Sequence, residues 1–235
     1  MAQRKEEFII GEIYHITLHG IEGRDIFVTI DDRWRGVFSL YEFNNSNPIT
    51  IRRQREKREQ FKYQVRRSLA PAEIEVVVQE DQRDKLVEIL AFVFMPNHIH
   101  LLLRQLKPNG ISIFMQKFGS GYASYFNKKY QRIGHLFQGK FKESHIMGDE
   151  YLRTVVTYIH MNPASIIEPG WKEAGIKKPL KMIEFLEKYR WSSYLDYIGK
   201  KNFPSVTERD FAQNVFGSSQ KIKEFVDARV YSLRK

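Results

Sequence analysis

The sequence predicts an α+β protein in which strands and helices alternate along a chain of 235 residues. Two observations carry this prediction. Some segments are rich in β-branched and aromatic residues, as strands are, and others repeat their apolar residues at helical spacing. Hydrophobic residues make up 42% of the chain, which is enough to build a core. The length fits one domain, or one domain with an appendage.

The first half of the chain contains most of the expected strands. Residues 12–18 alternate loosely with β-formers, and residues 25–30 form another extended piece after a glycine-containing turn. A short helix is expected over residues 34–47, running into a polar loop. Three further strands are expected at 72–78, 86–94 and 98–104.

The second half is mainly helical. Apolar residues at helical spacing predict a helix over 110–130, although it contains Gly119 and Gly121. Glycine costs a helix about 1 kcal/mol relative to alanine, which indicates close backbone packing or a kink. Residues 135–146 read as extended, and a helix over 150–161 is expected to begin at an Asp149 N-cap and to stop at Pro163. We expect a core over residues 1–165 and a C-terminal loop and helical extension over 166–235.

Composition excludes several classes of protein. The chain has no cysteine, which excludes disulfide scaffolds, thiol catalysis and cysteine zinc sites. No segment reaches the roughly 18 apolar residues of a membrane helix, and no apolar block of signal-peptide type follows the N-terminus. We therefore expect a cytoplasmic protein without a membrane partner. No glycine-rich phosphate loop of the Walker type is present, so no nucleotide cofactor is expected.

The charge points to a polyanionic partner. The formal net charge is +10, and residues 89–142 contain no Asp or Glu at all. Such a stretch suits a surface that lies along phosphates, although a merely basic soluble protein would also fit the overall charge. The candidate DNA-binding residues of this stretch are Arg104, Lys117, Lys128, Lys129, Arg132, Lys140 and Lys142.

A second basic run covers residues 51–68, with eight Lys or Arg residues against two Glu. A solvated helix face, an arm that contacts phosphates and a flexible insertion all fit this run. Arg52, Arg53 and Arg55 are its candidate DNA-binding residues.

Two histidines in the strand expected at 98–104 are candidate metal ligands. His98 and His100 are separated by one residue, and side chains alternate faces along a strand, so both point the same way. An exposed or hydrogen-bonded pair would show the same spacing. Ile99 and Leu101 face the other side, which makes the histidine face a polar face of a mostly apolar strand.

One tyrosine of the helix over 150–161 is a candidate nucleophile. Tyr158 shares a helix face with Tyr151 and with Asn162, which lies one turn onward, whereas His160 points elsewhere. A half-buried packing residue is the alternative, and helix geometry alone does not distinguish the two among 12 tyrosines.

Four motifs together resemble the REP-associated tyrosine transposases, a branch of the single-tyrosine HUH transposase superfamily. They are FMPNHIHLLL at 94–103, GHLFQGKFK at 134–142, YIHMNP at 158–163 and WSSY at 191–194. The resemblance covers roughly residues 8–199, and the order and spacing of the motifs make it specific.

The resemblance implies both a fold and a chemistry. It implies a ferredoxin-like core with a central antiparallel sheet flanked by helices, plus the C-terminal helical extension. It implies that His98 and His100 bind Mg²⁺ or Mn²⁺, with Asn162 completing the site, unless Glu143 or His145 does so instead. Tyr158 would attack a phosphodiester of single-stranded or hairpin DNA and form a covalent 5′-phosphotyrosine. A tyrosine hydroxyl is mostly protonated at neutral pH, so it must lose its proton to water or to a neighbouring group.

Two other functions stay open at the level of the sequence. A domesticated relative would recognise hairpin DNA or RNA without cutting it, although intact His98, His100 and Tyr158 argue against this reading. A hydrolytic metal phosphodiesterase would use water, so Tyr158 would be dispensable. The sequence leaves undecided whether the protein is a monomer or a homodimer, and it identifies neither the target DNA nor the role of residues 200–235.

Overall fold

A four-stranded antiparallel sheet in the order β2-β3-β1-β4 forms the centre of the protein. The computed structural model describes residues 7–48, 59, 81 and 83–235. The strands are β1 (Ile13–His19), β2 (Val87–Phe94), β3 (His98–Gln105) and β4 (Lys142–Ile146).

Two long helices follow β1 and β3 and complete the first layer. In the described residues, α1 (Ile30–Phe43) lies between β1 and β2, and α3 (Gly110–Lys129) lies between β3 and β4. A short 3-10 turn, η1 (Ile21–Gly23), links β1 to α1. This β-α-β-β-α-β order is that of a ferredoxin-like fold. The predicted α+β class, with an antiparallel sheet flanked by helices, is confirmed.

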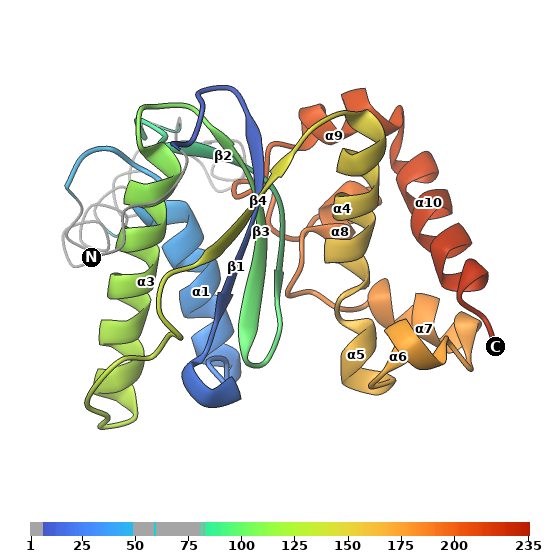
Figure 1. Cartoon of the computed structure of the whole chain (residues 1–235), viewed down its shortest axis with the longest axis horizontal. Helices are drawn as coiled ribbons and strands as arrows, with labels where there is room; N and C mark the ends of the chain where they lie inside the picture. Colours follow the sequence, from blue (N-terminus) through green and yellow to red (C-terminus); the bar gives the residue numbers. More distant parts are fainter. Residues whose placement is uncertain (1–6, 49–58, 60–80, 82) are drawn as a thin grey trace, which may run out of the picture.

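The sheet separates two helical layers. Figure 1 shows α1 and α3 together on one face, with α4 and the C-terminal helices on the other. This second layer consists of α4 (Asp149–Met161), α5 (Ala164–Ile167), α6 (Trp171–Ala174), α7 (Pro179–Leu186), α8 (Tyr194–Tyr197), α9 (Arg209–Phe216) and α10 (Ser219–Ser232).

Burial on both faces explains the apolar sequences of the central strands. Nearly every residue of β2 is buried, because helices cover the strand from both sides. In β3, Ile99 and Leu101 pack in the core under α1 and α3, whereas Leu102 packs in the core under α4. His98 and His100, at the start of β3, point to the same face as Leu102, which is the α4 face, because alternate residues of a strand share a face.

Close packing between α1 and α3 explains one of the two helical glycines. A Cβ atom at Gly121 would lie 2.3 Å from the ring of Phe43 in α1, whereas a Cβ atom at Gly119 would meet nothing within 4 Å. The expectation of close backbone packing is therefore correct for Gly121 and wrong for Gly119.

A buried carboxylate joins the same two helices. Asp32 caps α1 together with Thr29, and it accepts hydrogen bonds from Lys129 and Tyr130 at the other end of α3. Burial alone would raise the pKa of Asp32, but the hydrogen bonds from Lys129, Tyr130, Thr29 and Tyr125 outweigh it and hold the pKa below its usual value.

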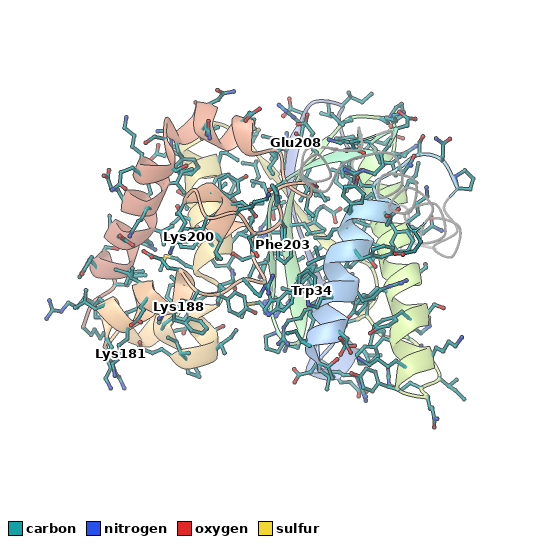
Figure 2. The ribbon with its side chains drawn as sticks, turned by 180° about the vertical axis from the view of Figure 1, so that it is seen from behind. Trp34, Lys181, Lys188, Lys200, Phe203 and Glu208 are labelled. Atoms are coloured by element: carbon teal, nitrogen blue, oxygen red, sulfur yellow. The ribbon has the colours of Figure 1, made fainter. Side chains whose placement is uncertain are left out.

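The C-terminal segment covers the free edge of β2. Phe92 and Phe94 exchange backbone hydrogen bonds with Trp191 and Ser193. Further along, the ring of Phe203 lies edge-on against the ring of Trp34 in α1, with 5.7 Å between the centroids (Figure 2). The extension therefore reaches from the α4 layer around the sheet edge to the α1 layer.

Several predicted elements differ from the structure. Residues 25–29 have no strand partner among the described residues, and α1 begins at Ile30 rather than at residue 34. Of the extended stretch 135–146, β4 pairs in the sheet and Phe137 forms an isolated bridge with Gly20. Gly148 is the N-cap of α4 and Asp149 is its first residue, where a negative charge still suits the helix dipole. The predicted strand at 72–78 and the basic run at 51–68 lie outside the described residues, apart from Glu59. No described helix is long and apolar enough to cross a membrane.

Candidate active site

Histidines from two neighbouring strands meet on the α4 face of the sheet. In the antiparallel pairing of β1 with β3, Thr17 lies opposite His100 and His19 lies opposite His98. Directly opposed residues point to the same face, so β1 adds its own polar side chains to the pair predicted in β3.

The four imidazoles are in contact. His15 Nε2 and His100 Nδ1 share a hydrogen bond of 2.9 Å, and Thr17 Oγ1 lies 3.4 Å from the same Nδ1 atom. The ring centroids of His98 and His100 are 4.9 Å apart, and those of His19 and His98 are also 4.9 Å apart.

Burial keeps these rings neutral at physiological pH. It lowers the pKa of His98 to about 4, with smaller contributions from the charges of His19 and Lys172. Burial also lowers the pKa of His15 to about 4 and that of His100 well below its usual value. Neutral imidazole has a free nitrogen lone pair, which is the form that binds a metal ion.

The hydrogen bonds of the two predicted ligands leave one nitrogen of each ring available. His98 Nδ1 lies 2.7 Å from Asn97 Oδ1, and a carbonyl oxygen can only accept, so this nitrogen carries the hydrogen. The lone pair of His98 is therefore on Nε2. The contacts of His100 likewise use Nδ1. A polar partner that fixes the tautomer is the usual support of a metal-binding histidine.

Tyr158 lies beside the histidines. It projects half-buried from α4, and its ring is edge-on to that of His100, with 5.5 Å between the centroids and 86° between the planes. Its centroid is 6.1 Å from that of His15. The Nζ atom of Lys172, in α6, donates a hydrogen bond of 2.9 Å to the Tyr158 hydroxyl. By contrast, Tyr151 is 47% exposed, and none of its described ring contacts involves the histidines.

Asn162 stands at the C-terminal end of α4, one turn beyond Tyr158. It is the C-cap residue and is buried, and its Nδ2 atom donates a hydrogen bond of 3.0 Å to the backbone carbonyl of Tyr158. The amide nitrogen is therefore used within the helix, and only the carbonyl oxygen remains for a ligand. Its role at the metal stays a prediction.

The alternatives to Asn162 face away from the site. His145 and Glu143 of β4 lie opposite Tyr14 and Ile16 of β1, whose side chains belong to the core under α1 and α3. His145 stacks on Tyr14 and bonds Glu12. Both side chains thus point to the opposite face of the sheet from His100, and the expectation that either completes the site is wrong.

The donor set suits a metal with open positions. In the described part of the chain, no three His, Asp or Glu side chains form a group that could hold a metal ion by itself. Two neutral imidazoles, of which His98 has a fixed tautomer, fit a catalytic ion that takes its remaining ligands from an amide oxygen, water and phosphate.

The described candidate DNA-binding residues differ in whether the protein itself occupies their side chains. Three have strong internal partners: Arg104 pairs with Glu88, Lys117 donates to the backbone carbonyls of residues 45–47, and Lys129 pairs with buried Asp32. The structure gives these three a role in the fold. Arg132 bonds Asn127. Three others have exposed side chains: Lys128, Lys140 and Lys142. Arg52, Arg53 and Arg55 lie outside the described residues.

Sequence reasoning missed two parts of the site. His15, Thr17 and His19 occupy alternate positions of β1, and this spacing was a readable signal of one polar strand face. Lys172 carried no signal, because it stands 14 residues after Tyr158, beyond Pro163 and Gly170.

A comparison with protein families agrees with the motifs. Residues 50–162 match the family described as "Transposase IS200 like". No curated protein matches the chain. Among solved structures, one match is a REP-associated tyrosine transposase bound to a REP hairpin. It is 16% identical, the alignment covers 88% of this chain and 94% of that one, and the TM-score is 0.46.

Proposed function

Because residues 50–162 match the IS200-like transposase family, we propose that the protein is a metal-dependent transposase that nicks and joins single-stranded DNA through a covalent tyrosine intermediate. The family match supports the resemblance that the motifs indicated. The match ends at Asn162, so it includes the histidine pair and the tyrosine helix.

The position of Tyr158 next to His100 carries this proposal. A nucleophile and a metal-binding pair must act on the same phosphorus atom, and these two groups come from elements far apart in the sequence. In the proposed nicking step, the Tyr158 oxygen attacks phosphorus and the bond from phosphorus to the 3′ oxygen breaks. The phenolic proton leaves to water, and the 3′ oxygen takes a proton. A new 3′-hydroxyl reverses the step and joins another end.

His98 and His100 would hold Mg²⁺ or Mn²⁺, with the carbonyl oxygen of Asn162 as a third ligand. A bound ion supplies charge that polarises a non-bridging phosphate oxygen and offsets charge in the transition state. The surroundings of His98 and His100 favour the neutral form that binds a metal ion. Asn97 fixes the tautomer of His98, and burial keeps both rings neutral.

The exposed lysines of the acid-free stretch suit a DNA backbone. Lys142 in β4 lies opposite Thr17 in β1, so it is on the histidine face of the sheet. Burial lowers the pKa of His19, and the positive charge of Lys142 lowers it further. Lys128 and Lys140 are the other exposed candidate lysines of this stretch, and Lys128 lies in α3, on the opposite face of the sheet. We propose single-stranded or hairpin DNA as the partner, because backbone contacts by lysine give affinity without dependence on sequence.

A covalent adduct assay tests this function. The protein is incubated with Mg²⁺ or Mn²⁺ and an oligonucleotide that contains a hairpin with single-stranded flanks, and adducts are separated on a denaturing gel. Wild type and Tyr151→Phe should form the adduct, and Tyr158→Phe should not. Each substitution removes one oxygen and keeps the ring, so folding and DNA binding should survive in both variants.

Mass spectrometry of the trapped adduct locates the modified residue. A DNA-linked peptide that contains Tyr158 would support the proposal. An adduct on another tyrosine would refute the assignment of the nucleophile. Metal-dependent cleavage by Tyr158→Phe without any adduct would indicate a hydrolytic phosphodiesterase instead.

A further inference from the structure

Lys172 makes two contacts with the proposed nucleophile. Its Nζ atom donates a hydrogen bond of 2.9 Å to the hydroxyl oxygen of Tyr158, and the same atom lies 4.6 Å from the centroid of the tyrosine ring. An ammonium group has three hydrogens and no lone pair, so it can only donate. The tyrosine oxygen accepts this bond, and its own hydrogen must point elsewhere.

The neighbouring residue fixes the position of Lys172. Trp171 is 5% exposed and packs in one core cluster with Met161 and Ala164, which end α4 and begin α5. Gly170 precedes it with φ of +79°, a left-handed conformation that turns the chain back towards α4. The element that bears Lys172 is therefore anchored to the end of the tyrosine helix itself.

The charge of Lys172 is directed to the site. Within the described residues, no carboxylate lies within ion-pair distance of its Nζ atom, although many other lysines of the chain pair with one. The Tyr158 ring that its Nζ atom contacts lies edge-on to the ring of His100, with 5.5 Å between the centroids. The ammonium thus lies near both parts of the site, the metal-binding pair and the tyrosine.

We propose that Lys172 is a further catalytic residue, which holds the Tyr158 oxygen and stabilises negative charge on it. This inference rests on the function proposed above. During nicking, the hydrogen bond orients the oxygen for attack on phosphorus. During joining, a 3′-hydroxyl attacks phosphorus and loses its proton to water, the bond from phosphorus to the tyrosine oxygen breaks, and the tyrosine oxygen leaves with the electron pair. The ammonium stabilises the leaving phenolate until water protonates it.

The physical size of the effect is measurable. A donor aimed at an oxygen where charge develops is commonly worth about 10²-fold in rate, and more in a site closed to water. Because Lys172 is exposed, we expect a loss of roughly 10- to 10²-fold when the charge is removed. The substitution Lys172→Met keeps most of the aliphatic chain, and Lys172→Arg keeps the charge.

Single-turnover kinetics test the proposal. The rates of adduct formation, and of joining from isolated adduct to a strand with a free 3′-hydroxyl, are measured at saturating oligonucleotide for each variant. Lys172→Met should slow both steps, Lys172→Arg should recover most of the rate, and DNA affinity should change little. The matched control is Lys181→Met, which removes an exposed lysine of the same extension, in α7 (Figure 2).

The outcomes separate this inference from the proposed function. If wild type forms no adduct, the proposed function fails. If wild type forms the adduct and Lys172→Met forms and resolves it equally fast, only the role of Lys172 fails. A variant that binds DNA more weakly but reacts at the wild-type rate when saturated would also overturn the catalytic role, because Lys172 would then serve binding alone.

Discussion

The Nε2 atom of His160 lies 2.9 Å from the hydroxyl oxygen of Ser193, and this hydrogen bond joins the tyrosine helix to the C-terminal segment. The same hydroxyl accepts a hydrogen bond from the backbone N–H of Phe92 in β2. His160 is fully buried and faces away from Tyr158. It therefore fixes the rotation of α4 that turns Tyr158 towards the histidine pair.

The buried His160 should make the fold sensitive to acid. Burial lowers the pKa of His160 from 6.5 to about 3, so the folded state excludes a proton that the unfolded state takes up below pH 6.5. The contribution of neutral His160 to the free energy of unfolding is thus fully present above pH 6.5, and it is lost as the pH falls towards 3. In urea unfolding at a series of pH values, the free energy of unfolding should rise with pH less steeply for His160→Gln than for wild type. The difference between the two slopes should be about 1.4 kcal/mol per pH unit in this window.

His15 and His98 also have lowered pKa values, but they are present in both proteins and cancel in this comparison. Parallel stability curves for wild type and His160→Gln would contradict the prediction.

Removal of either predicted metal ligand should separate cleavage from binding. We expect His98→Ala and His100→Ala to lose cleavage with Mg²⁺ or Mn²⁺ and to keep most of their DNA affinity, because phosphate contacts come from other side chains. His145→Ala is the control, since it removes a histidine from the opposite face of the sheet. Cleavage assays run beside filter binding measure both properties, and full activity in either site variant would remove the metal assignment.

Gly119 and Gly121, inside α3, should respond in opposite directions to alanine. Gly121→Ala forces a Cβ atom against the ring of Phe43 and should cost about 1–3 kcal/mol of stability. Gly119→Ala meets open space and should add about 0.5–1 kcal/mol, because alanine loses less backbone entropy in a helix. Chemical denaturation of both variants measures the difference, and equal effects would show that α1 gives way to the added methyl group.

The parts of the site that the sequence predicts are those that depend on a single element. His98 and His100 share a face because strand periodicity requires it, and Tyr158 and Asn162 share a face because helix periodicity requires it. The same rule applied to β1 predicts that His15, Thr17 and His19 share one face, because they occupy alternate positions of the strand.

The remaining features depend on contacts between elements. Lys172 reaches Tyr158 only because Trp171 packs against the end of α4 and Gly170 turns the chain. A count of basic residues could not show that Lys117 and Lys129 are bonded within the protein, because their partners are the carbonyls after α1 and the carboxylate of Asp32. Sequence periodicity and composition describe a single helix or strand, whereas the bonding partners of these lysines lie on other elements of the fold.

The backbone bonds between β2 and residues 191–193 have a consequence for self-association. An unpaired sheet edge is a template on which another chain can add a strand and aggregate. The segment that begins with Trp191 occupies this position on β2, the most apolar strand of the sheet, and so blocks intermolecular strand addition there. The WSSY motif thus protects the solubility of the protein, and a chain cut before residue 191 should aggregate through β2 even if every residue of the active site were intact.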